Sequence, residues 1–142
     1  MAWWLFQMNQ NKIFDNGLSY TVQDLKKAIE AGHQDWGWFH DNYLNVSVGD
    51  DVLIRTAKDK NKRYSSVVLA QAKVTKIPAD YEDYFRLEFR KEESEKLMAN
   101  PINDEQLRPF LKHPEAPKNK TIQPLSDETG ELMQSHLGTE AM

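Results

Sequence analysis

The chain has 142 residues, about the length of one domain, and its 39% apolar and 28% charged residues predict a soluble protein with a modest core. There is no run of about 18 apolar residues, no signal-peptide pattern at the start and no cysteine, so we expect a cytoplasmic protein without a membrane span, a disulfide or a cysteine-based metal site. The net charge of −4 disfavours a broadly basic protein that coats nucleic acid, but it is compatible with a local basic patch.

The first half of the chain predicts a strand, a helix and a β-hairpin. The aromatic-rich run 2–8 is typical of a buried strand, and we expect so early a strand to be central to a sheet. Residues 21–31 predict a helix that a threonine caps at its start and that ends at Gly32. Two apolar runs, 51–56 and 66–77, follow a Gly-Asp turn and predict a hairpin with a basic tip.

The second half predicts one further strand and then short helices. Residues 84–90 alternate apolar and charged side chains, as a half-buried strand does. From Lys91 onward the pattern has no firm period, and several prolines prevent long elements. We expect a short helix over 103–107, capped by its first or second residue, and a last helix that starts at Pro124 and closes at Gly138.

Several markers occur along the chain in a particular order. They are an aromatic first strand, the helix at 21–31, a loop with Trp36, the stretch Asn42 to Leu44, the run Val48-Gly49-Asp50-Asp51-Val52-Leu53-Ile54, a basic-tipped hairpin, Leu107 with Phe110-Leu111-Lys112-His113-Pro114, and Ile122-Gln123-Pro124-Leu125-Ser126. This ordered set resembles EVE domains, which are relatives of the YTH, ASCH and PUA domains. The resemblance implies an α+β protein with a PUA-like fold, a small curved mixed β-barrel flanked by short helices. The domain would span 1–138, with a frayed tail at 139–142.

The resemblance also implies a function, namely a non-catalytic nucleic-acid-binding module that captures a modified base, for example a methylated one, in an aromatic pocket. Its partner would be DNA or RNA, and we expect no cofactor and no metal. The chain departs from the family pattern near that pocket, where Arg55-Thr56-Ala57 stands in place of Tyr-His-Ser and Asn9-Gln10-Asn11 in place of Ser-Glu-Pro. The base modification and the choice between DNA and RNA therefore stay open.

The segment 33–40 is dense in aromatic and polar residues and has no clean period, which indicates an irregular or functional stretch. In an extended segment Trp36 and Trp38 would face the same way and form a stacking wall, with Gly37 letting a ligand approach the backbone. The alternative is that both tryptophans are core residues. The predicted ligand pocket comprises Trp36, Trp38, Asp35, Arg55, Thr56 and Trp4.

The other pocket residues also have competing interpretations. Asp35 could accept a hydrogen bond from a base amino group, and Arg55 and Thr56 could contact a phosphate or a base edge. An exposed strand end without a function explains Arg55 and Thr56 equally well. Trp3 and Trp4 point to opposite faces of a strand, so we expect at least one of them in the core.

The hairpin tip carries a dense basic run. Its four cations are predicted to hold phosphates of the nucleic-acid backbone without reading the sequence: Lys58, Lys60, Lys62 and Arg63. The competing interpretation is a solvated tip that keeps the protein soluble.

A small nucleotide- or RNA-processing enzyme of ASCH-like type is one alternative function. His33 or His40 would act as the base, with Asp35 or Asp41 beside it. The spacing of these residues matches no recognised metal or acid–base motif, which favours loop-structuring roles.

A protein-interaction domain is the second alternative. Tyr81, Tyr84 and Phe85 could form the contact surface of a homodimer if they were exposed together.

Overall fold

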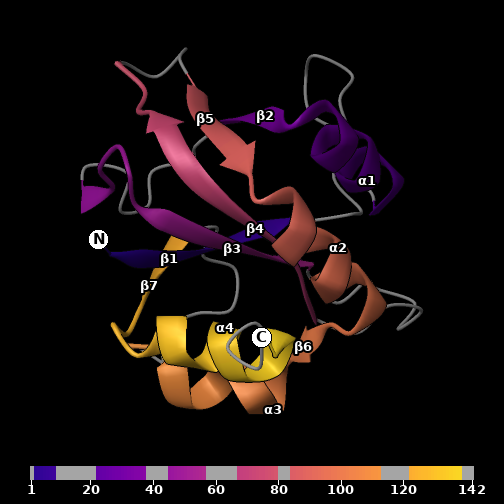
Figure 1. Ribbon diagram of the computed structural model, residues 1–142. Coiled ribbons are helices and arrows are strands. Elements are labelled where there is room, and N and C mark those ends of the chain that lie inside the picture. The colour runs from indigo at the N-terminus through magenta and orange to yellow at the C-terminus, as the bar shows by residue number, and fades with distance from the viewer. Residues whose placement is uncertain are drawn as a thin grey trace, which may run out of the picture.

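The protein consists of a mixed β-sheet with short helices around it (Figure 1). The structure is a computed structural model, and it describes residues 2–8, 22–37, 45–56, 67–79, 84–112 and 122–138. The strands are β1 (Trp3–Met8), β2 (His33–Gly37), β3 (Asp51–Thr56), β4 (Val67–Lys76), β5 (Tyr84–Phe89), β6 (Ile102–Asn103) and β7 (Ile122–Leu125). The helices are α1 (Val22–Ala31), α2 (Lys91–Ala99), α3 (Asp104–Leu107), the 3₁₀ turn η2 (Arg108–Phe110) and α4 (Thr129–Leu137). In these described ranges no helix has the length and apolarity needed to cross a membrane.

The strand order is β2-β5-β4-β3-β1-β7, with β6 paired to the start of β4. β1 runs parallel to β3 and antiparallel to β7, which confirms the prediction that the first strand is central. The rings of Phe6 on β1 and Phe85 on β5 meet edge to face, 5.4 Å apart, although β3 and β4 lie between these strands in the sheet. The sheet is therefore strongly curved. Across the described residues its path stays open from β2 to β7, so the α+β class and the mixed sheet are confirmed without a closed ring of strands.

Each face of the sheet carries its own core, because successive side chains of a strand point to opposite faces. On one face Phe6 and Ile54 pack with Leu25 of α1 in the larger apolar cluster. On the other face lie Leu5 and Leu53, together with residues from α2, α3 and α4 such as Leu97, Leu107 and Met133. Figure 1 shows α3 and α4 beside one another, well away from α1.

The Gly-Asp turn before β3 is built around the buried carboxylate of Asp50, which is 4% exposed. This carboxylate accepts hydrogen bonds from the indole Nε1 of Trp4 (2.9 Å), the amide of Ser47 (2.8 Å) and the amide of Ala2 (3.3 Å). The amide of Val74 on β4 also donates to the Asp50 carbonyl (2.9 Å). One aspartate thus joins the starts of β1 and β3 to the end of β4.

The predicted helix ends are confirmed where local hydrogen bonds define them. The amide of Gly32 donates to the Ala28 carbonyl (2.8 Å) at the end of α1. Asn103 and Gln106 form a reciprocal capping box at the start of α3, with distances of 2.8 and 3.0 Å. Gly138 ends α4 in the left-handed conformation. The capping threonine predicted for α1 lies outside the described residues.

Two expectations about secondary structure are wrong. The start of the segment 33–40 is a regular strand, because β2 pairs antiparallel with β5 from His33 opposite Glu88 to Gly37 opposite Tyr84. Pro124 belongs to β7 and not to the last helix, which starts only at Thr129. β7 lies at the end of the described strand order, where a residue without an amide hydrogen is tolerated.

The segment after Lys91, in which we found no firm period, forms the helix α2. Its Ser94 is fully buried and joins it to β4: the hydroxyl accepts from the Gln71 amide (3.1 Å) and donates to the Gln71 carbonyl (3.0 Å). Tertiary contacts therefore stabilise a helix whose apolar pattern is weak.

Candidate nucleic-acid interface

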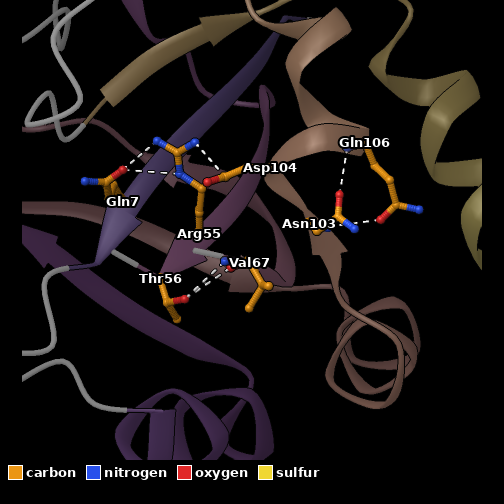
Figure 2. Close-up of polar contacts among 7 residues, drawn as sticks. All are labelled: Gln7, Arg55, Thr56, Val67, Asn103, Asp104 and Gln106. Carbon is orange, nitrogen blue, oxygen red and sulfur yellow. Dashed lines mark hydrogen bonds and ion pairs between the residues drawn. The ribbon is translucent and has the colours of Figure 1, made fainter. Parts of the chain in front are cut away.

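Arg55 is a buried cation at the carboxyl end of β3, where it stands in register with Gln7 of the parallel strand β1. Figure 2 shows its guanidinium between Gln7 on one side and Asp104 on the other. Nε and Nη2 both donate to Gln7 Oε1, at 3.2 and 2.6 Å, and Nη1 donates to Asp104 Oδ1 at 3.3 Å. We call Gln7, Arg55 and Asp104 the Arg55 cluster.

Asp104 belongs to a different part of the fold from the two strands. It is the first residue of α3, and the capping box of Asn103 and Gln106 holds that helical turn beside the strand ends (Figure 2). The Asp104 side chain is 57% exposed, whereas that of Arg55 is 10% exposed. A planar guanidinium in this setting has the donor geometry for a phosphate oxygen or a base edge.

The backbone around Arg55 is irregular. The register between β3 and β4 shifts between Ile54 and Arg55, so that Ile54 lies opposite Ala70 and Arg55 opposite Val68. Bulges of this kind re-aim side chains at the rims of sheets.

Thr56, the next residue, closes the β3–β4 hairpin. It is 1% exposed, and its hydroxyl accepts from the Val67 amide (3.3 Å) and donates to the Val67 carbonyl (3.4 Å) (Figure 2). Adjacent strand residues point to opposite faces, so Thr56 and Arg55 do not share one surface. The interpretation of this pair as an exposed strand end is wrong, since both residues are buried.

The predicted basic tip follows Thr56 in the sequence. Lys58, Lys60, Lys62 and Arg63 lie outside the described residues, in the segment that joins Thr56 to Val67. The segment leaves β3 after Thr56, one residue beyond Arg55, so the chain itself connects the basic run to the end of the sheet that carries the Arg55 cluster.

Trp4 requires a correction. It is 6% exposed, belongs to the larger core cluster, and its indole N–H is bound to Asp50. A tryptophan packed between core side chains has no free face for a base, so we exclude Trp4 from the candidate pocket. Trp3 is only partly buried and packs against the core of the opposite face, as strand alternation requires.

Asp35 lies on β2, away from the Arg55 cluster. It is exposed and pairs with Arg86, its direct cross-strand neighbour on β5, at 3.5 Å. Asp35 pairs with Arg86, whereas Arg55 binds Gln7 and Asp104, so the structure does not bring Asp35 and Arg55 together. The Trp36 backbone pairs with Phe85, while the Trp36 side chain and the whole of Trp38 lie outside the described residues.

The residues proposed for the alternative functions lie only partly within the described ranges. Among the described residues no three His, Asp or Glu side chains are grouped as a metal site, and His40 and Asp41 lie outside them. Phe85 is fully buried, which removes it from the predicted homodimer surface. Tyr84 is 44% exposed, and Tyr81 lies outside the described residues.

Gln7 and Asp104 are site residues that sequence analysis missed. Nothing in the sequence indicates that Gln7 pairs with Arg55, 48 positions away. Asp104 carried a signal only as a possible helix cap. The pairing depends on the parallel register of β1 and β3, which is a property of the tertiary structure.

The described elements form a curved mixed sheet with a parallel β1–β3 pair and short helices on both faces. This is the arrangement that the resemblance to EVE domains and their PUA-like relatives implies.

Solved structures of similar fold match the chain from end to end. The structure of human THYN1 protein in complex with DNA containing 5-methylcytosine matches with a TM-score of 0.62, covers 96% of this chain and 98% of that chain, and shares 13% sequence identity. Protein Atu2648 from Agrobacterium tumefaciens matches with a TM-score of 0.61 at 13% identity, over 96% of this chain and 93% of that one. The DUF55 domain of human thymocyte nuclear protein 1 matches with a TM-score of 0.59 at 12% identity, over 97% and 99%.

Comparison by sequence finds less. No protein-family model matches the chain, and no curated protein matches it significantly. At identities of 12–13% the similarity to the solved structures establishes the fold.

Proposed function

We propose that this protein is a nucleic-acid-binding module and that it captures a modified base, for example a methylated one, without catalysing a reaction. The observation that carries the proposal is the fold. Over 96% of its length the chain is similar in fold to the human THYN1 protein, whose structure was solved in complex with DNA containing 5-methylcytosine. The buried cation at one end of the sheet, next to the basic segment, supports it.

In this proposal different residues hold the backbone and the base. Lys58, Lys60, Lys62 and Arg63 contact phosphates, and Arg55 contacts a phosphate or a base edge from a fixed position. Thr56 acts indirectly: its hydrogen bonds to the Val67 backbone hold together the ends of β3 and β4 between which the basic segment lies in the sequence.

Trp36 and Trp38 form the aromatic wall for the captured base, with Asp35 near its rim. A base taken out of its stack regains about 1–3 kcal/mol by stacking on an aromatic face. An added methyl group in an apolar slot contributes only about 1 kcal/mol more, so we expect modest discrimination between modified and unmodified bases.

A binding titration tests the proposal. Tryptophan fluorescence is followed at fixed salt while single-stranded or duplex DNA or RNA is added, with and without 5-methylcytosine or N6-methyladenine. We expect a quench that depends on the modification in the wild-type protein, that disappears in Trp36→Ala, and that persists in the control Trp3→Phe. Recovery of the oligonucleotide unchanged after long incubation checks that binding is not followed by chemistry.

The same titration can refute the proposal. If no polymer binds at low salt, where phosphate contacts are strongest, the protein is not a nucleic-acid-binding module. If all polymers bind equally with and without the modification, the module binds nucleic acid but does not read a base.

A further inference from the structure

The two partners of Arg55 differ in a way that has consequences for binding. Gln7 is neutral, and its carbonyl oxygen accepts from two guanidinium nitrogens at 3.2 and 2.6 Å. Asp104 is charged, and its carboxylate is reached by Nη1 alone, at 3.3 Å. Gln7 therefore orients the guanidinium, while Asp104 makes one longer contact to its remaining edge.

The exposure of Asp104 makes that contact easy to exchange. Its side chain is 57% exposed, so water solvates the carboxylate with or without Arg55, and ion pairs to such groups add little to stability. Arg55 itself is 10% exposed and would be costly to leave without an anionic partner. The buried Arg55 guanidinium therefore needs an anionic partner, whereas water can solvate the Asp104 carboxylate when Arg55 is bound elsewhere.

A phosphodiester oxygen has the charge and the acceptor geometry to replace this carboxylate. Arginine binds phosphate by parallel N–H donors on one edge of the guanidinium, and such charge-assisted bonds are stronger than neutral ones. The neighbouring segment 57–66 carries four of the cations of the chain, so a nucleic-acid backbone that they attract arrives at the same end of β3.

We propose that Asp104 occupies the phosphate position of the Arg55 cluster in the free protein and that a nucleic-acid phosphate displaces it on binding. Gln7 is the positioning residue, which keeps the guanidinium in place during the exchange. Asp104 lowers the affinity, both by competing for Nη1 and by repelling the incoming phosphate. This inference rests on the proposed function and adds an internal competitor to it.

The test compares two variants that each remove one negative charge. Asp104→Asn keeps the size of the side chain and removes the competing charge. Glu30→Gln removes the same charge from an exposed position on α1, which covers the opposite face of the sheet. Affinity for fluorescein-labelled single-stranded and duplex DNA and RNA is measured by anisotropy at fixed low salt, and folding of each variant is checked by thermal unfolding.

We expect Asp104→Asn to bind about two- to fivefold more tightly than the wild-type protein, the range that follows from the strength of half-exposed ion pairs. Glu30→Gln should change the affinity much less, because its charge is screened over the distance between the two faces. The double variant Arg55→Lys with Asp104→Asn should lose the gain, since the gain depends on the guanidinium.

The outcomes separate this inference from the function on which it rests. If the wild-type protein binds and Asp104→Asn gains no more affinity than Glu30→Gln, Asp104 is not a competitor of the phosphate. The proposed nucleic-acid-binding function is then unaffected. A loss of affinity in Asp104→Asn does the same, because it makes Asp104 a contributor to binding. If neither the wild-type protein nor Asp104→Asn binds DNA or RNA, both proposals fall.

Discussion

Replacement of Asp50 by asparagine tests the most connected polar group of the fold. The carboxylate accepts three N–H donors while 4% exposed, with Trp4 and Ser47 on Oδ2 and Ala2 on Oδ1. Asparagine can offer its one oxygen to Trp4 and Ser47, but its NH₂ group then faces the Ala2 amide, so two donors oppose each other. The substitution keeps the shape and changes only the hydrogen bonding.

The expected cost follows from those contacts. The bonds to Trp4 and Ser47 lose their charge assistance, which makes such bonds roughly twice as strong as neutral ones, and the Ala2 amide loses its acceptor. We estimate a loss of about 2–3 kcal/mol in the free energy of unfolding. At this chain length that corresponds to a fall in Tm of about 5–10 °C.

Urea and thermal unfolding of Asp50→Asn, followed by circular dichroism, provide the measurement. The matched control is Asp51→Asn, the same chemical change one residue later, where the carboxylate has one ion-pair contact to Lys73 at 3.7 Å. Such a pair contributes about 0–1 kcal/mol. The reasoning about the buried carboxylate is refuted if the two variants unfold within about 0.5 kcal/mol of each other, the range of ordinary surface substitutions.

Three further substitutions test other local features. Ser94→Ala removes the hydroxyl that joins α2 to β4 and should cost about 1–3 kcal/mol in urea unfolding, while the exposed Ser135→Ala should be near neutral. Thr56→Val keeps the size of a side chain that closes the hairpin and should cost about 1–2 kcal/mol; an unchanged urea midpoint would contradict its role there. Gly138→Ala should cost about 1 kcal/mol, which lowers Tm by a few degrees, because φ at Gly138 is 67° and a side chain is strained there. The control is Gly130→Ala on α4, where the added methyl group makes only an ordinary contact, 3.7 Å from the Trp3 indole. This control should be neutral or slightly stabilising.

The candidate site was predictable only in part. Arg55 was identified because it stands at the end of the strand that follows the Gly-Asp turn, where the resemblance to EVE domains places polar groups of the pocket. Its partners were not identified, because Gln7 and Asp104 lie 48 and 49 positions away and reach it only through the parallel β1–β3 register and the placement of α3. The sequence thus indicated a charged group, and the fold determined what that group contacts.

Trp4 illustrates the opposite failure. Strand alternation puts Trp3 and Trp4 on opposite faces but does not say which face is the more deeply buried. The structure places Trp4 in the larger core and binds its N–H to Asp50, a residue 46 positions away. An aromatic residue in a strand predicts burial as readily as recognition, and only the packing around it distinguishes the two.

The sequence by itself determined those features that hydrogen bonds between residues close in the chain stabilise. The end of α1 at Gly32, the capping box of Asn103 and Gln106 and the end of α4 at Gly138 depend on hydrogen bonds to residues three or four positions away, so their signals are local. The tertiary structure alone decided β2, β7 and the Arg55 cluster. Their hydrogen bonds join distant segments, and the free energy that stabilises them is gained only when the sheet assembles.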